Sequence, residues 1–166
     1  MGDAGIGLGN EREEEPVSGR IVVGVDGSDE SVAALEWAAQ EARSRGAVLT
    51  IVTAWQFPHS AYLGLPGAMI PDELGEDLEW GAKETQADAL HRALPSGAGV
   101  PVETLVVEGP PASVLIDAAS GADMLVVGSR GLGGFRELLL GSVSQQCAHH
   151  ASCPVVIVRA REPVAA

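Results

Sequence analysis

The chain has 166 residues, of which 46% are hydrophobic and 4% are aromatic, and its formal net charge is −13. This length allows one domain with a sizeable core, which Val, Leu, Ile and Ala must build because aromatic residues are scarce. The acidic balance argues against nucleic acid and anionic membranes as partners, since both are bound through clustered Lys and Arg.

Targeting signals and cysteines bear on the compartment. No stretch approaches the roughly 20 apolar residues of a membrane span, and no basic region followed by an apolar core marks a secretion signal. The two cysteines, Cys147 and Cys153, fit a reducing compartment. We therefore expect a cytoplasmic protein that contacts neither membrane nor nucleic acid.

The two ends of the chain are expected to lie outside the folded domain. Residues 1–18 contain alternating glycines and then an acidic run. No strand precedes those glycines and no helix follows them, so they do not form a nucleotide fingerprint. We predict a disordered acidic tail at 1–18, one domain at 19–160 and a short C-terminal tail at 161–166.

Apolar runs and helical patterns alternate through the domain. Short β-branched runs predict strands, and apolar residues at i, i+3, i+4 spacing predict helices that end at Gly or Pro. In chain order we expect a strand at 20–25, a helix at 30–45, a strand at 47–54, a helix at 72–94, a strand at 101–107, a helix at 110–119, a strand at 122–128, a helix at 141–151 and a strand at 154–158.

This alternation predicts an α/β fold, in which helices cover both faces of one open, twisted, parallel five-stranded sheet. In such a Rossmann-like sheet, ligands bind outside the carboxyl ends of the strands, where the strand order reverses. If the order is 3-2-1-4-5, the reversal lies between the first and fourth strands. The loops at 26–28 and 128–131 then converge on one crevice.

The second loop has the pattern of a phosphate cradle. Gly128-Ser129-Arg130-Gly131 directly follows an apolar run, and Gly141-Ser142 opens the next helix nine residues later. Glycines after a strand let the backbone approach a ligand closely, and a helix N-terminus offers free N–H groups and a partial positive charge. The loop has no Lys and is therefore not a P-loop.

These motifs resemble the ATP-binding signature of the universal stress protein family, and the likeness covers about residues 18–160. Residues 21–28 are similar to the family's opening strand and acidic turn, and residues 128–135 to its glycine loop. Residues 140–144 resemble its phosphate-binding turn, and 153–158 its closing strand. The resemblance implies the order 3-2-1-4-5, bound ATP with Mg²⁺ held through the phosphates, and a homodimer through residues 154–158.

The resemblance also implies a role for each site residue. Asp26 would contact the ribose or adenine, and the apolar residues before the loops would wall the adenine. The glycine loop would follow the ribose and phosphates, and the helix start would hold the β- and γ-phosphates. The predicted site therefore comprises Val25, Asp26, Ala54, Val127, Gly128, Arg130, Gly131, Gly141, Ser142, Val143 and Ser144, with no catalytic residue and no metal ligand.

Several of these residues have purely structural alternatives. Asp26 can form an Asx turn, and Ser28 is expected to cap the first helix. Arg130 can be a solvated loop side chain, while Ser142 and Ser144 can merely cap a helix. The Cys and His residues at 147, 149, 150 and 153 do not match a common zinc spacing, so we predict no metal site there.

Two functions of different class remain. The first is a regulatory nucleotide-binding module of the stress response, and the alternative is a slow ATP hydrolase or related nucleotide hydrolase of the same fold. Nucleotide α-hydrolases carry a Ser-Gly-Gly-x-Asp loop after the first strand, whereas this chain has Asp26-Gly27-Ser28-Asp29. No evident base lies near the proposed γ-phosphate, so we expect slow or absent hydrolysis.

Overall fold

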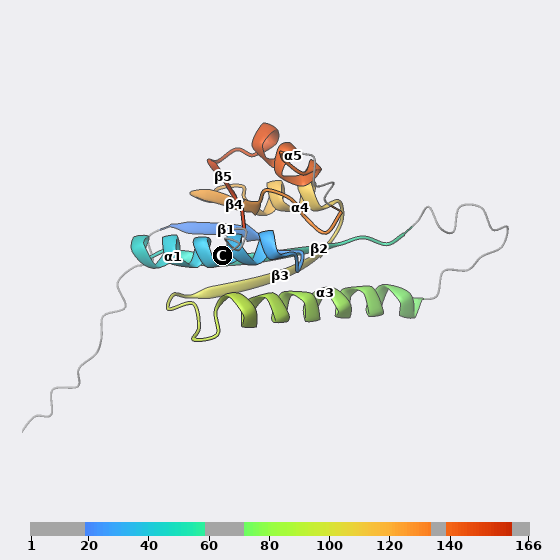
Figure 1. The fold of residues 1–166 in the computed structure, drawn as a ribbon. Helices are drawn as coiled ribbons and strands as arrows, with labels where there is room; N and C mark the ends of the chain where they lie inside the picture. Colours follow the sequence, from blue (N-terminus) through green and yellow to red (C-terminus); the bar gives the residue numbers. More distant parts are fainter. Residues whose placement is uncertain (1–18, 59–71, 134–138, 161–166) are drawn as a thin grey trace, which may run out of the picture.

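The computed structural model describes residues 19–58, 72–133 and 139–160, so both expected tails lie outside the described residues. The predicted α/β fold is confirmed: a parallel five-stranded sheet has the order β3-β2-β1-β4-β5 (Figure 1). In chain order the elements are β1 Arg20–Gly24, α1 Asp29–Arg45, β2 Val48–Trp55, α3 Asp72–Ala93, β3 Val102–Glu108, α4 Pro111–Ala118, β4 Met124–Gly128, α5 Ser142–His150 and β5 Val155–Val158.

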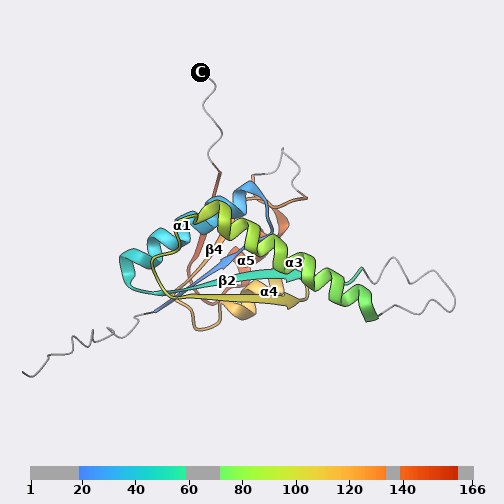
Figure 2. The same ribbon diagram turned by 90° about the horizontal axis from the view of Figure 1, so that it is seen from below.

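Helices cover the sheet on both faces. One face carries α1 and α3, and the other carries α4 and α5 (Figures 1 and 2). Successive strand side chains point to opposite faces, so Ile21 and Val23 pack under α1, whereas Val22 belongs to the core under α4. Burial on both faces explains why β1 and β4 read as continuous apolar runs. Among the described residues, no helix is both long and apolar enough to cross a membrane.

Element boundaries differ from the predicted ones by one or two residues, and hydrogen bonds explain why. The Ala47 N–H donates to the Ala42 carbonyl at 3.0 Å and so closes α1 rather than starting β2. At the other end, the Trp55 carbonyl accepts from the Gly109 N–H at 2.8 Å and extends β2. Ala122 donates to Ala119 at 3.0 Å in a turn, which delays the start of β4.

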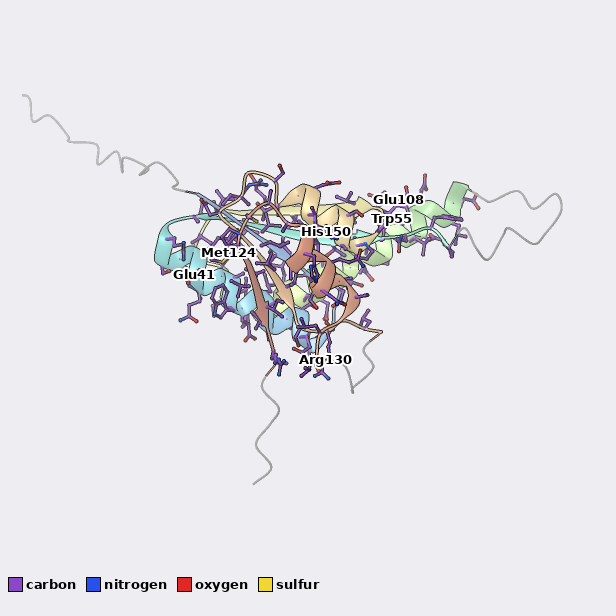
Figure 3. The ribbon with its side chains drawn as sticks, turned by 90° about the horizontal axis from the view of Figure 1, so that it is seen from above. Glu41, Trp55, Glu108, Met124, Arg130 and His150 are labelled. Atoms are coloured by element: carbon purple, nitrogen blue, oxygen red, sulfur yellow. The ribbon has the colours of Figure 1, made fainter. Side chains whose placement is uncertain are left out.

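The strand order reverses at β1, which pairs with β2 on one side and with β4 on the other. Val23 lies opposite Val126, so the loops that follow β1 and β4 leave the same edge of the sheet side by side. Figure 3 shows Arg130 beyond the carboxyl end of β4, far from Met124 at its amino end. The predicted switch point is therefore where two polar loops meet.

A buried amide fixes α3 on the sheet. Gln86 Nε2 lies 3.2 Å from the Ile51 carbonyl, 3.0 Å from the Leu105 carbonyl and 3.2 Å from Thr53 Oγ1. The side chain thus contacts both β2 and β3, and it is 5% exposed. A buried polar group is stable only when it is hydrogen-bonded, so these contacts set the position of α3 along the strands.

Candidate functional site

A cavity of about 480 Å³ lies at the switch point. The structure brings all eleven residues of the predicted site into its lining, from the ends of β1, β2 and β4, the loop after β4, and the start of α5. Sequence reasoning missed some lining residues, among them Gly24, Ser31, Val52, Pro111, Leu115, Leu132 and Gly133. The pairing register of β1 and β2 could have indicated Gly24 and Val52. These two residues lie opposite each other, and they are close in sequence to the predicted wall residues Val25 and Ala54.

One part of the cavity is apolar. Val25 and Val127 are 4% and 3% exposed, and they reach the lining from β1 and β4. Ala54 and Leu115 add apolar surface from β2 and α4. Apolar walls close to backbone polar groups suit a heterocyclic base, which gains free energy from burial and orientation from the hydrogen bonds.

Asp26 joins the two loops. Its Oδ1 accepts from the Ser28 N–H at 3.0 Å and from Ser28 Oγ at 2.5 Å. The bond to the Ser28 N–H forms the Asx turn that the sequence allowed for Asp26. Its Oδ2 accepts from the Leu132 N–H at 3.1 Å, across 106 residues of sequence. A Cβ at Gly131 would lie 2.5 Å from Oδ2, so any other residue here would displace the carboxylate.

Glu30 is a second carboxylate that holds the site, and sequence reasoning missed it. It accepts from Arg130 Nη2 at 2.9 Å, from Ser129 Oγ at 3.2 Å and from the Ala160 N–H at 2.6 Å. Burial alone would raise the pKa of Glu30, but the hydrogen bonds from Ala160, Arg130 and Ser129 outweigh it and lower the pKa below 4.5. Arg130 is therefore ion-paired within the chain.

Ser129 closes the base of the glycine loop. Its N–H donates to the Val158 carbonyl at 2.7 Å, and its carbonyl accepts from the Gly141 N–H at 2.7 Å. The Ser144 hydroxyl donates to that same carbonyl at 3.0 Å and to the Gly141 carbonyl at 2.9 Å. The hydroxyl that the resemblance assigns to phosphate therefore donates hydrogen bonds within the chain.

The start of α5 opens into the cavity. Its N-cap is Gly141, no side chain caps it, and its first turn contains no acidic residue. The first N–H groups of a helix have no partner within the helix, and the helix dipole adds partial positive charge at this end. Residues 141–144 all line the cavity. The arrangement can therefore bind an anion beside an apolar wall.

Cys147 packs in the core rather than in the site. It is fully buried between α5 and the sheet. Burial, with a smaller contribution from Cys153, raises the pKa of the Cys147 thiol to about 11. A thiol with this pKa stays protonated at neutral pH and behaves as a small apolar side chain.

Comparison with known proteins agrees with this fold and identifies the family. The model of the universal stress protein family matches residues 18–159, and the chain therefore belongs to that family. A universal stress protein of Thermus aquaticus is 41% identical over 142 residues, which are 84% of this chain and 97% of the relative. Universal stress protein Rv2624c of Mycobacterium tuberculosis is 33% identical over 147 residues, or 89% of this chain. The chain spans about half the length of this mycobacterial relative.

Solved structures with this fold include nucleotide complexes. A universal stress protein in complex with cAMP is 32% identical, has a TM-score of 0.62, and matches 87% of this chain and 99% of its own. The universal stress protein of Archaeoglobus fulgidus in complex with dAMP is 26% identical, has a TM-score of 0.58, and matches 86% of this chain and 98% of its own.

Proposed function

We propose that this chain binds an adenine nucleotide in the cavity between β1 and β4 and acts as a regulatory module of the stress response. The observation that carries the proposal is the meeting of two unlike surfaces in one cavity. Apolar walls from Val25, Ala54 and Val127 lie in the same cavity as the uncapped N-terminus of α5. A base and a phosphate in one ligand match these two surfaces, and the cAMP and dAMP complexes of similar proteins support the match.

The proposed pose places the adenine against the apolar walls and the phosphates toward α5. The backbone N–H groups of residues 142–144 donate hydrogen bonds to the phosphate oxygens, since these groups have no partner within the helix. Asp26 lies at the ribose end and keeps Gly131 and Leu132 in place. ATP with Mg²⁺ held through the phosphates is the ligand that the family resemblance implies for this pose.

Nucleotide extraction tests the proposal most directly. The purified protein is denatured, and the released small molecules are identified by mass spectrometry. Calorimetry on nucleotide-free protein then compares adenosine, AMP, cAMP and Mg-ATP, with GMP as a base control. We expect an adenine nucleotide in the extract or saturable heat with at least one adenine ligand. A nucleotide-free extract together with no heat from any of them contradicts the proposal.

Hydrolysis is the competing function, and the described site argues for slow or absent turnover. Asp26 accepts three hydrogen bonds within the chain, and Arg130 is paired with Glu30. Fast phosphoryl transfer needs a group placed to orient water and charge placed for the transition state. A turnover near the median enzyme rate of about 10 s⁻¹, abolished by Ser142→Ala, would make the protein an enzyme.

A second copy of the chain is the proposed partner, paired through residues 154–158. β5 is an edge strand of the sheet, and its four residues are apolar and only half-buried. Exposed strand edges pair with other strands, and a twofold axis makes such a contact self-complementary. We expect a dimer by analytical ultracentrifugation at micromolar concentration. A monomer, or a dimer unchanged by Val156→Asp, contradicts this contact.

The proposed location is the cytoplasm. Both cysteines are free, Cys147 in the core and Cys153 partly buried. Free thiols are typical of reducing compartments, and fractionation with an antibody against the chain tests the location.

A further inference from the structure

The charges around the cavity are unevenly placed. Arg130 is the one cation among the described residues that line it, and Asp26 is the one anion. Glu30 lies behind the glycine loop and is paired with Arg130 at 2.9 Å. Counted with Glu30, the charged groups at the site therefore sum to −1. Bound phosphate would add to this negative charge.

We propose that Glu30 determines how much phosphate charge the site accepts, because it holds Arg130 in an ion pair and so favours an adenosine monophosphate over free ATP. This inference rests on the proposed nucleotide binding. ATP then binds well only with its Mg²⁺, which neutralises the charge that Arg130 does not. Glu30 acts through Arg130 and is a positioning residue for the ligand.

Within the ion pair, Glu30 is the more firmly held side chain. The Glu30 side chain is 12% exposed, whereas that of Arg130 is 32% exposed. Ser129 Oγ and the Ala160 N–H donate to the same carboxylate, so Glu30 keeps two partners even when Arg130 leaves. Its lowered pKa keeps the carboxylate ionised at neutral pH. A phosphate must therefore compete with a fixed, ionised carboxylate for the guanidinium.

The backbone contact next to the ion pair also fixes Glu30. A Cβ at Gly128 would lie 2.8 Å from the Glu30 carbonyl carbon, so the start of α1 packs directly on the end of β4. The backbone of Glu30 is therefore fixed relative to β4, and Ser129 and Ala160 hold its carboxylate beside Arg130. Charge-assisted pairs of this kind strengthen when they are partly removed from water.

The test compares ligands that differ only in phosphate number. Calorimetry without Mg²⁺ measures adenosine, AMP and ATP on the wild type, on Glu30→Gln and on Glu36→Gln, which alters an exposed glutamate of the same helix. We expect the wild type to bind AMP at least as tightly as ATP. In Glu30→Gln, ATP affinity rises about tenfold and AMP affinity rises less, because one charge-assisted bond is released to the phosphates. Adenosine affinity stays constant, and Glu36→Gln behaves as the wild type.

A double-mutant cycle separates this role from a structural one. In an Arg130→Gln background, Glu30→Gln should no longer change the ratio of ATP to AMP affinity, since the pair is already absent. Equal shifts for adenosine and ATP, or an unchanged ratio in Glu30→Gln, overturn the inference. If Glu30→Gln does not fold, wild-type binding of free ATP tenfold tighter than AMP overturns it alone. Absence of binding by all three ligands, and also by cAMP and Mg-ATP, with a nucleotide-free extract, instead defeats the proposed function.

Discussion

Three helix N-termini adjoin the cavity, those of α1, α4 and α5, and two of them, α1 and α5, differ in how their free N–H groups are satisfied. α1 begins after Ser28, whose Oγ accepts from the Ser31 N–H at 3.2 Å, and its first turn carries Asp29 and Glu30. α5 begins after Gly141, with no side-chain cap and no acidic residue in its first turn. The residue at the cap position thus decides whether a helix end is satisfied by the chain itself or remains available to a ligand.

The largest effect should come from giving α5 the kind of cap that α1 has. Gly141 has extended backbone geometry, with φ −75° and ψ 165°, which Asp adopts readily. In Gly141→Asp the carboxylate accepts from the first N–H groups and repels phosphate. We expect nucleotide affinity to fall about a hundredfold while the unfolding free energy changes by about 0.5 kcal/mol or less. Calorimetry and thermal melting measure the two quantities.

Gly141→Ala is the matched control, because it adds the same Cβ without the carboxylate. That Cβ would lie 3.3 Å from the Arg130 Cα, a tight contact that a small shift relieves. Affinity should fall far less than in Gly141→Asp. If the Ala and Asp variants bind nucleotide equally, the free N–H groups of α5 do not hold the phosphates.

The second effect concerns the bond that ties the two loops together. Gly131→Ala brings a Cβ to 2.5 Å from Asp26 Oδ2 and displaces the carboxylate from the Leu132 N–H. We expect an affinity loss of about tenfold and a stability loss of about 1.5 kcal/mol, the lower end of the range for one hydrogen bond to a charged group. Denaturant melts and calorimetry check both, and wild-type values in both would show that the loops are not coupled through Asp26.

A smaller effect is expected when the helix cap of α1 is removed. Ser28→Ala removes the cap, and the expected cost is about 1 kcal/mol of unfolding free energy, seen as a lower melting temperature. Nucleotide affinity should fall less than in Gly131→Ala, because Ser28 does not line the cavity and acts on it only through its bonds to Asp26 Oδ1. An affinity loss as large as that in Gly141→Asp would contradict the assignment of the phosphates to α5.

The smallest effect is a pH dependence at Glu30. The folded pKa of this group lies below the ordinary value of 4.5, so its contribution to stability is fully present above that pH. The contribution is lost as pH falls through the folded pKa, where both states become protonated. The melting-temperature difference between wild type and Glu30→Gln should therefore be constant near neutrality and shrink below about pH 4.5. A difference that grows on acidification contradicts the assigned direction.

The sequence predicted the strands of the sheet from local signals, whereas the cavity walls came from the family resemblance. Each strand is a short apolar run, and the glycines mark close approaches, to a backbone at Gly128 and Gly141 and to the Asp26 carboxylate at Gly131. The strand order came from the family resemblance, and the structure confirms it. Ser28 was expected to cap α1, and its contact with Ser31 confirms this.

Long-range polar contacts could not be predicted, because nothing local marks them. Asp29 and Glu30 are neighbouring acidic residues at the start of the same helix, and the sequence does not distinguish them. Only Glu30 contacts Arg130 and Ala160, which lie 100 and 130 residues away. Gln86 sits on an otherwise polar stretch of α3, and only the structure shows that its amide reaches β2 and β3. Side-chain partners depend on the packing of elements, which one sequence does not specify.

The bond between Ser129 and Gly141 has a consequence for how this family can vary. Because the Gly141 N–H donates to the Ser129 carbonyl at 2.7 Å, the chain returns to its starting point after eleven residues. The entropy of closing a loop grows slowly with its length, by about 0.6 kcal/mol for each doubling. An insertion between residues 133 and 139 keeps the lining residues 130–133 and 141–144 unchanged. Such an insertion should therefore leave the domain folded, which makes this position suitable for grafting a foreign sequence.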